Sequence, residues 1–241
     1  MPSVLAYHRP ENLEEAAILL AEPNRRAVGG GTVVVPQSRI PSDGGVEIVD
    51  LQSLGLDRIE ALGERVTIGA MVRLGDLMLD ESVPALLRDL ARRELPSALR
   101  NQATVGGTVA LGDGESVLLA GLLAHDAQVE THTRGSIGLA DHLANPSRDI
   151  IIGVSVAAAG AGVVESVART PADVPIVSAV ARMTGEGVRV VLTGVGPTPV
   201  LVDPTDPASS LNPPADFRGS VEYRKHLAMT VTARAVGRVK S

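Results

Sequence analysis

Cysteine is absent from the 241-residue sequence, and aromatic residues are scarce, with one Phe, two Tyr and no Trp. Without cysteine, the chain can form no disulfide, no cysteine-ligated iron–sulfur cluster and no thiolate nucleophile. The scarcity of aromatic side chains removes the stacking platforms that usually bind single-stranded nucleic acid. The net charge of −6 argues the same way, because nucleic-acid-binding surfaces are basic. We therefore expect no nucleic-acid partner, and we expect any iron–sulfur chemistry to come from another polypeptide.

Membrane, secretion and metal-binding signals are also missing. No apolar run approaches the length of about 18 residues that predicts a transmembrane helix. The first residues lack the basic start and apolar stretch of a secretory signal. The five histidines do not have the spacing of a metal site. These absences favour a cytoplasmic protein with no membrane insertion and no metal site of its own.

The common catalytic signatures are absent as well. There is no GxxxxGK[ST] phosphate loop and no GxSxG nucleophile elbow. Prolines follow Gly194–Val195–Gly196, so these glycines cannot begin a Rossmann helix. Acid pairs such as Glu14–Glu15 are sequence neighbours and do not face one cleft on a helix. We expect no catalytic side chain in this protein.

The order of periodic segments indicates an α+β protein. Residues 13–20 have helical spacing after Asn12, a predicted N-cap with Glu15 completing a capping box. The apolar run 117–124 predicts a buried helix in which Gly121 permits close packing. Further helices are predicted from an N-cap at Ser82 to about Glu94, and through Tyr223, Leu227, Val231 and Ala235. The predicted strands are 46–51, 65–70, 128–131, 176–183 and 188–195, the last two forming a hairpin.

Two glycine-rich segments carry the chemical signal. The first, Gly29–Gly30–Gly31–Thr32, follows a short extended run, and residues 33–35 are predicted to continue one element up to Pro36. The second is Thr104–Val105–Gly106–Gly107–Thr108. Consecutive glycines expose backbone N–H groups with no Cβ in the way, as a pyrophosphate cradle requires. A tight turn is the alternative interpretation of each segment taken alone.

Residues 99–107 (LRNQATVGG) and 122–130 (LLAHDAQVE) resemble the FAD-binding domain of molybdopterin dehydrogenases, which include the medium subunits of carbon monoxide dehydrogenases and the flavin domain of xanthine dehydrogenase. The first glycine segment lies where that family has its first pyrophosphate loop. Further matching motifs extend the resemblance over nearly the whole chain: Arg9–Pro10, Ile68–Gly69–Ala70, residues 171–177, residues 194–199 and residues 222–227.

The resemblance implies a fold and a domain division. Residues 1–157 would form an FAD-binding PCMH-type domain of two α+β subdomains. Residues 158–241 would form a small α+β domain, similar to the C-terminal domain of carbon monoxide dehydrogenase flavoproteins, with a three-stranded antiparallel sheet.

The resemblance also implies a function, that of an FAD-binding electron-transfer subunit in a molybdenum hydroxylase complex. Its partners would be an iron–sulfur small subunit and a molybdenum-cofactor large subunit, with FAD passing electrons to an acceptor. The implied cofactor-binding residues are Val28, Gly29, Gly30, Gly31, Thr32, Val33, Val34, Thr104, Val105, Gly106, Gly107, Thr108 and Asp113.

The sequence departs from the family pattern at several positions. Thr108 replaces a frequent Asn, and Val33 replaces a residue that is often polar. Val117 falls where many members have an acid, for which Asp113, Glu115 or Ser116 are candidate substitutes. A family lysine near the flavin falls near Glu165. The chain is also shorter than usual, mostly around residues 141–153 and 160–164.

Two alternatives remain open at this stage. One is a degenerate homologue that keeps the fold as a structural scaffold without flavin, which Val117 and Glu165 favour. The other is a stand-alone flavin oxidase or reductase, for which no acid–base pair is evident.

Single residues have structural interpretations too. Tyr7 is interpreted as a packing residue at a strand edge, and Tyr223 as a core residue on a helix face. Arg100 is interpreted as either a local ion-pair partner or a phosphate ligand, and Thr32 and Thr104 as phosphate contacts or turn caps.

Overall fold

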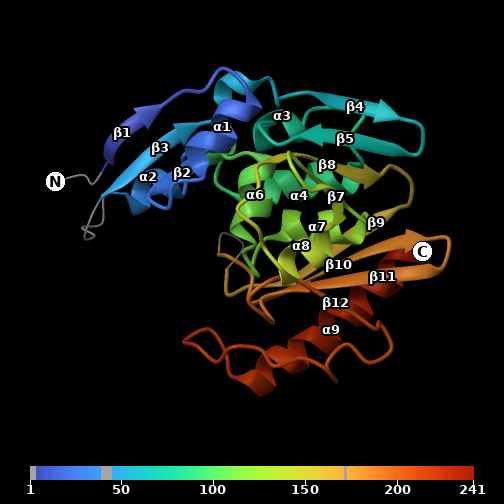
Figure 1. The fold of residues 1–241 in the computed structure, drawn as a ribbon. Helices are drawn as coiled ribbons and strands as arrows, with labels where there is room; N and C mark the ends of the chain where they lie inside the picture. Colours follow the sequence, from blue (N-terminus) through green and yellow to red (C-terminus); the bar gives the residue numbers. More distant parts are fainter. Residues whose placement is uncertain (1–3, 39–44, 171–172) are drawn as a thin grey trace.

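The computed structural model describes residues 4–38, 45–170 and 173–241, which form three β-sheets with flanking helices (Figure 1). The sheets follow one another along the chain, and each has its own main hydrophobic cluster. The predicted α+β class is confirmed.

The first subdomain is a three-stranded parallel sheet covered by one helix. Its strands are β1 (Val4–His8), β2 (Arg25–Val28) and β3 (Val46–Asp50), in the order β1-β3-β2. The helical segments are α1 (Leu13–Leu20), α2 (Val34–Gln37) and the 3-10 turn η1 (Gln52–Leu54). The predicted cap of α1 is confirmed, since Asn12 Oδ1 accepts the Glu15 N–H at 2.9 Å. The Glu15 carboxylate accepts from Glu11 N–H at 2.8 Å, one residue before the expected capping-box donor.

The second subdomain is a five-stranded antiparallel sheet with most of the helices on one side (Figure 1). Its strands are β4 (Ile59–Leu62), β5 (Arg65–Gly69), β6 (Gln128–Thr131), β7 (Gly135–Gly138) and β8 (Ile151–Ala157), in the order β4-β5-β8-β6-β7. Its helices are α3 (Leu74–Leu77), α4 (Ala85–Glu94), α5 (Ser97–Arg100), α6 (Val105–Leu111), α7 (Val117–Ala124) and α8 (Leu139–Ala144).

Helix α7 is the buried centre of the molecule, as its apolar sequence predicts. It contacts α4 on one side and strands β10 (Val177–Thr184) and β11 (Gly187–Thr193) on the other. Gly121 permits the approach to α4, because a Cβ there would lie 2.3 Å from Leu90 Cδ1. A helix covered on all sides carries no amphipathic stripe, and every residue of α7 except Leu123 is buried.

The C-terminal domain is an antiparallel sheet covered by α9 (Val221–Val239). Its strands are β9 (Gly162–Val167), β10, β11 and β12 (Val200–Val202), in the order β12-β11-β10-β9. The predicted hairpin and C-terminal helix are confirmed. Since α9 covers one face and α7 the other, the first six residues of β10 are buried.

This sheet has four strands, so the expected count of three was wrong. The fourth strand is Val200–Val202, which pairs with β11 as an edge strand. Pro199 and Pro204 flank the three residues without interrupting them, so the strand keeps its N–H donors.

Two predicted element boundaries were also wrong. Pro36 lies inside α2 and does not end it, because the first turn of a helix tolerates a residue without an N–H. Helix α4 begins at Ala85 after Pro84, whereas Ser82 belongs to a turn in which its N–H donates to Asp80.

No helix of the described residues is long and apolar enough to cross a membrane.

Strand β8 ends at Ala157, and β9 begins the next sheet at Gly162. On this basis we propose that the FAD-binding domain ends at residue 157 and the C-terminal domain begins at residue 158, as expected from the sequence. The two domains nevertheless share packing, since Val180 and Val191 of the C-terminal sheet belong to the hydrophobic cluster around α7.

Candidate functional site

The first glycine segment is a loop between β2 and α2 with unused backbone donors. The N–H groups of residues 29–33 have no hydrogen-bond acceptor among the described residues. Gly31 has a φ of +70°, a left-handed conformation that glycine adopts without strain. Successive N–H groups in such a turn form a concave anion-binding nest.

This loop lies directly against the second glycine segment. A Cβ added to Gly30 would lie 1.7 Å from Gln102 O, and one added to Gly29 would lie 2.8 Å from Thr104 Oγ1. The glycines therefore serve two purposes, which are close contact between the segments and an open backbone. The structure brings together the two segments that the sequence analysis singled out.

The second segment is the start of α6, and its backbone donors are occupied. Val105 N–H donates to Val72 O at 3.0 Å, and Gly106 N–H donates to Ala70 O at 2.8 Å. Thr104 caps the helix, because its Oγ1 accepts the Gly107 N–H at 3.1 Å. The Thr108 N–H also donates to Thr104 O, at 3.0 Å. The two segments look alike in sequence, but of the two only the first has a run of donors without an acceptor in the described ranges.

Two cavities border these segments. The larger, of about 390 Å³, is lined by the loop residues 29–34 and by Thr104, Gly107 and Thr108. The other, of about 360 Å³, shares Gly29, Val34, Thr104 and Gly107 with it. The smaller cavity is also lined by Arg25, Arg26, His142 and Arg148. Both volumes lie within the range of roughly 300–1,000 Å³ that is typical of ligand pockets.

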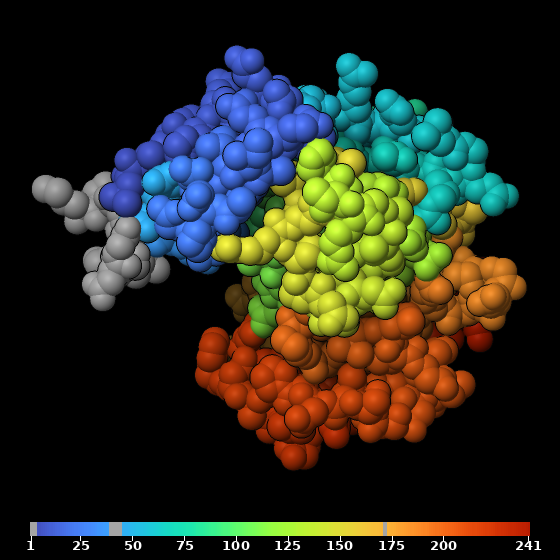
Figure 2. All heavy atoms as spheres, viewed as in Figure 1, coloured from blue at the N-terminus to red at the C-terminus, as the bar shows by residue number. Residues whose placement is uncertain are grey.

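The smaller cavity lies between the first subdomain and the segment that precedes β8. Arg148 joins the two by donating to Pro23 O at 3.2 Å. Figure 2 shows these parts in blue and yellow, touching on the same face of the molecule, with the C-terminal domain in orange and red below.

The implied cofactor residues are distributed unequally over this site. Gly29, Gly30, Gly31, Thr32, Val33, Val34, Thr104, Gly107, Thr108 and Asp113 line the larger cavity. Gly106 lines only the smaller one. Val28 and Val105 line neither, because their side chains are buried in the protein.

The loop before α7 supplies polar groups where Val117 has none. Val117 is a buried core residue. Asp113, Glu115 and Ser116, the candidate substitutes, all line the larger cavity. Asp113 Oδ1 accepts the Glu115 N–H at 2.9 Å, and Ser116 Oγ accepts the Leu119 N–H at 3.0 Å as the cap of α7.

Glu94 also lines the larger cavity and was missed by the sequence analysis. Its carboxylate accepts the Leu118 N–H at 2.8 Å, near the start of α7. Burial raises the pKa of Glu94, and the negative charge of Asp113 adds to the rise, while hydrogen bonds from Ser116 and Leu118 oppose it. Nothing local in the sequence distinguishes this residue from a surface glutamate at a helix end.

The expectation that Glu165 lies near the ligand was not met. Glu165 belongs to β9 and forms an ion pair with Arg238 of α9. It lines neither cavity. Its charge therefore gives no argument against an anionic ligand.

The remaining single-residue interpretations have mixed outcomes. Arg100 donates to the carbonyls of Arg92 and Leu95, so it caps the end of α4. It forms no salt bridge with another described residue and lines neither of the two cavities. Tyr7 is 60% exposed, and its hydroxyl donates to Asp50. Tyr223 is 44% exposed, so it was wrong to expect it in the core.

No group of three or more His, Asp or Glu side chains in the described residues is arranged to hold a metal ion. The backbone donors described above are suited to an anionic group, and the two cavities beside them are suited to an elongated ligand.

The fold is that of a chain present in carbon monoxide dehydrogenase structures. A carbon monoxide dehydrogenase from Hydrogenophaga pseudoflava, which lacks the Mo-pyranopterin moiety, superposes with a TM-score of 0.89 at 22% identity, covering 98% of this chain and 97% of the other. The Cu,Mo-CO dehydrogenase structure gives a TM-score of 0.88 at 23% identity, covering 100% and 99%.

Sequence comparison identifies the family. Residues 3–156 match the family described as the FAD binding domain in molybdopterin dehydrogenase. The chain is 26% identical to the carbon monoxide dehydrogenase medium chain of Afipia carboxidovorans, over 100% of this chain and 98% of that protein. It is 28% identical to YgfM of Escherichia coli K12, over 94% and 93%. The chain therefore belongs to this family of flavoprotein oxidoreductase subunits, whose cofactor is FAD.

Proposed function

We propose that this protein is the FAD-binding electron-transfer subunit of a molybdenum hydroxylase complex. The observation that carries the proposal is a run of five N–H groups, at residues 29–33, that have no acceptor within the described residues and lie beside two cavities of about 390 and 360 Å³. A dinucleotide has a central pyrophosphate and two extended arms. The N–H groups suit the pyrophosphate, and the two cavities suit the arms. When bound, FAD would accept electrons from an iron–sulfur subunit and pass them to an acceptor.

The protein's own residues would bind and orient the cofactor. The first loop would hold the pyrophosphate through its backbone, with Thr32 as an additional hydroxyl donor. The second segment would act mainly as a wall, because Gly106 must pack against Ala70, where a Cβ would lie 2.7 Å from the Ala70 side chain. Asp113 would offer its second carboxylate oxygen to a hydroxyl of the cofactor.

The proposed partners are an iron–sulfur subunit and a molybdenum subunit. Curated relatives are named as a medium chain of carbon monoxide dehydrogenase and as FAD-binding subunits of aldehyde oxidoreductase and xanthine dehydrogenase. Because this sequence contains no cysteine, a cysteine-ligated cluster in such a complex would belong to another chain.

The flavin-free scaffold is the competing hypothesis, and Val117 is the residue that favours it. The N–H groups of residues 29–33 argue against it, because they find no acceptor in the part of the chain that the structure describes, and a scaffold has no need for such donors beside a cavity.

The test is the absorbance spectrum of the purified chain, recorded before and after incubation with excess FAD and desalting. The proposal predicts one equivalent of FAD that is retained on the protein and released on denaturation. A chain that retains no flavin, even when co-expressed with the small and large subunits of its complex, would refute the cofactor proposal. The electron route is tested by adding the reduced iron–sulfur subunit, which should bleach the flavin absorbance of the loaded chain.

A further inference from the structure

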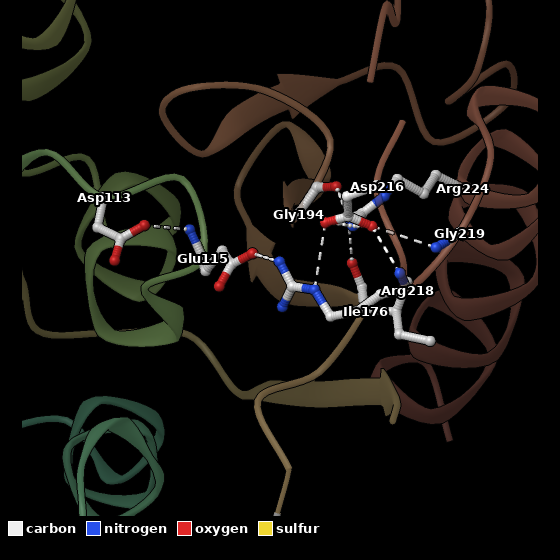
Figure 3. A network of polar contacts seen from close by, with 8 residues as sticks. All are labelled: Asp113, Glu115, Ile176, Gly194, Asp216, Arg218, Gly219 and Arg224. Atoms are coloured by element: carbon white, nitrogen blue, oxygen red, sulfur yellow. Dashed lines mark hydrogen bonds and ion pairs between the residues drawn. The ribbon is translucent and has the colours of Figure 1, made fainter. Parts of the chain in front are cut away.

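A network of polar contacts connects the C-terminal domain to the wall of the larger cavity (Figure 3). It begins at Arg224 of α9, whose side chain is fully buried. The Arg224 guanidinium donates to Ile176 O at 2.9 Å and to Gly194 O at 2.6 Å. It also donates to both carboxylate oxygens of Asp216, each at 2.8 Å, and holds the pKa of Asp216 at about 2.

Asp216 in turn fixes the tight turn that carries Arg218. Its Oδ1 accepts the Arg218 N–H at 2.9 Å and the Gly219 N–H at 3.2 Å. The Arg218 Nε donates to Asp216 Oδ2 at 3.3 Å. With its backbone and Nε held in this way, Arg218 extends its guanidinium to the carboxylate of Glu115, which lines the larger cavity.

The loop that contains Glu115 is held from the C-terminal domain at a second point. Gly194 N–H donates to Gly114 O at 2.8 Å. A Cβ at Gly114 would lie 2.1 Å from Gly196 O, so the two chain segments are in direct contact. The loop between α6 and α7 therefore depends on the C-terminal domain for its position.

The larger cavity is lined by acidic side chains, so the ion pair between Arg218 and Glu115 changes the charge of its wall. Within the described part of the chain, its lining includes the carboxyl groups of Glu94, Asp113 and Glu115 and no Lys, Arg or His. Such a wall repels the anionic cofactor of the proposed function. Arg218 offsets one of these charges at close range, and its side chain is only 19% exposed, so solvent screens the interaction less than at an open surface.

We propose that Arg218 is a positioning residue for cofactor binding, which orients Glu115 and neutralises it at the cavity wall. Affinity for FAD then depends on the C-terminal domain, although Arg218 does not itself line the cavity. This inference rests on the proposed function.

The test compares FAD affinities of variants of the full-length chain, measured by flavin fluorescence or titration calorimetry. In Arg218→Met, the dissociation constant for FAD should rise about tenfold or more, because Glu115 is left as an uncompensated charge. In Arg218→Met/Glu115→Gln, much of the affinity should return, because that charge is removed. Arg238→Met is the matched control: it breaks the ion pair with Glu165 elsewhere in the same domain and should bind FAD like the wild type.

The outcomes separate the two proposals. If the wild type binds no FAD, the proposed function fails. If the wild type binds FAD and Arg218→Met binds it equally well, only the role of Arg218 is refuted. A double variant as weak as Arg218→Met would show that Arg218 acts only as structural support. If Arg218→Met does not fold, Glu115→Gln alone decides: it should bind FAD at least as tightly as the wild type, and weaker binding overturns the inference.

Discussion

Gly30 and Gln102 approach so closely that a Cβ on Gly30 would lie 1.7 Å from the Gln102 carbonyl oxygen. The contact joins the loop after β2 to the segment before α6, so it fixes the spacing of the two walls of the proposed cofactor site. Because the opposing atom is backbone, neither side can rotate away.

Gly30→Ala should therefore separate the two segments and weaken FAD binding. We expect the dissociation constant for FAD to rise about tenfold or more, equivalent to a loss of about 1.4 kcal/mol. Equilibrium titration with FAD measures the effect. Gly185→Ala is the control, because a Cβ there meets nothing within 4 Å. Unchanged affinity in Gly30→Ala would contradict the proposed site.

Thr104→Val should destabilise the start of α6. The substitution keeps the shape of the side chain but removes the Oγ1 that accepts the Gly107 N–H at 3.1 Å. Loss of an N-cap costs about 1 kcal/mol, to be measured as the free energy of unfolding in urea. Thr104→Ser retains the acceptor and should lie closer to the wild type. Equal stability of all three proteins would show that the cap contributes nothing.

His125 should make the protein sensitive to acid. It is fully buried, its Nδ1–H donates to Ala157 O at 2.7 Å, and its Nε2 has no partner among the described residues. Burial lowers the pKa of His125 to about 4. Between pH 6.5 and 4 the unfolded state therefore binds more protons than the folded state, and stability falls as the pH falls through this window.

The contribution of His125 to this loss should reach about 3 kcal/mol by pH 4. Urea denaturation of the wild type and His125→Gln at several pH values measures it, since the variant lacks the titrating group. The difference in the free energy of unfolding between the wild type and the variant should change as the pH falls from 6.5 to 4. Parallel profiles would mean that His125 titrates normally.

Arg224→Met should strongly destabilise the C-terminal domain. The change leaves the carbonyls of Ile176 and Gly194 without this donor and removes the cation that faces Asp216. Breaking a buried charged network of this kind costs about 3 kcal/mol or more. The melting temperature should fall accordingly. Arg234→Met, an exposed position on the same helix, should change it little, and similar melting temperatures for the two variants would contradict the role of Arg224.

Local signals in the sequence accounted for several elements. The cap at Asn12, the buried helix α7 and the hairpin of β10 and β11 each depend on residues close together in the chain, so their patterns predict them directly. The two glycine segments could be found for the same reason. Arg224 had a detectable signal as well, because it lies three, four and seven residues before the buried Leu227, Ala228 and Val231.

The sequence by itself determined the α+β class, the family resemblance and the glycine segments that permit close backbone contact. Only the tertiary structure distinguished the two segments, because the donors of the second are occupied by Val72 and Ala70, about 30 residues away in the chain. The same holds for Glu94 of α4, which lines the larger cavity, and for Arg218 of the C-terminal domain, which pairs with Glu115 at the wall of that cavity. Whether a donor is free or a charge is compensated depends on contacts between distant segments, and local sequence patterns do not record these contacts.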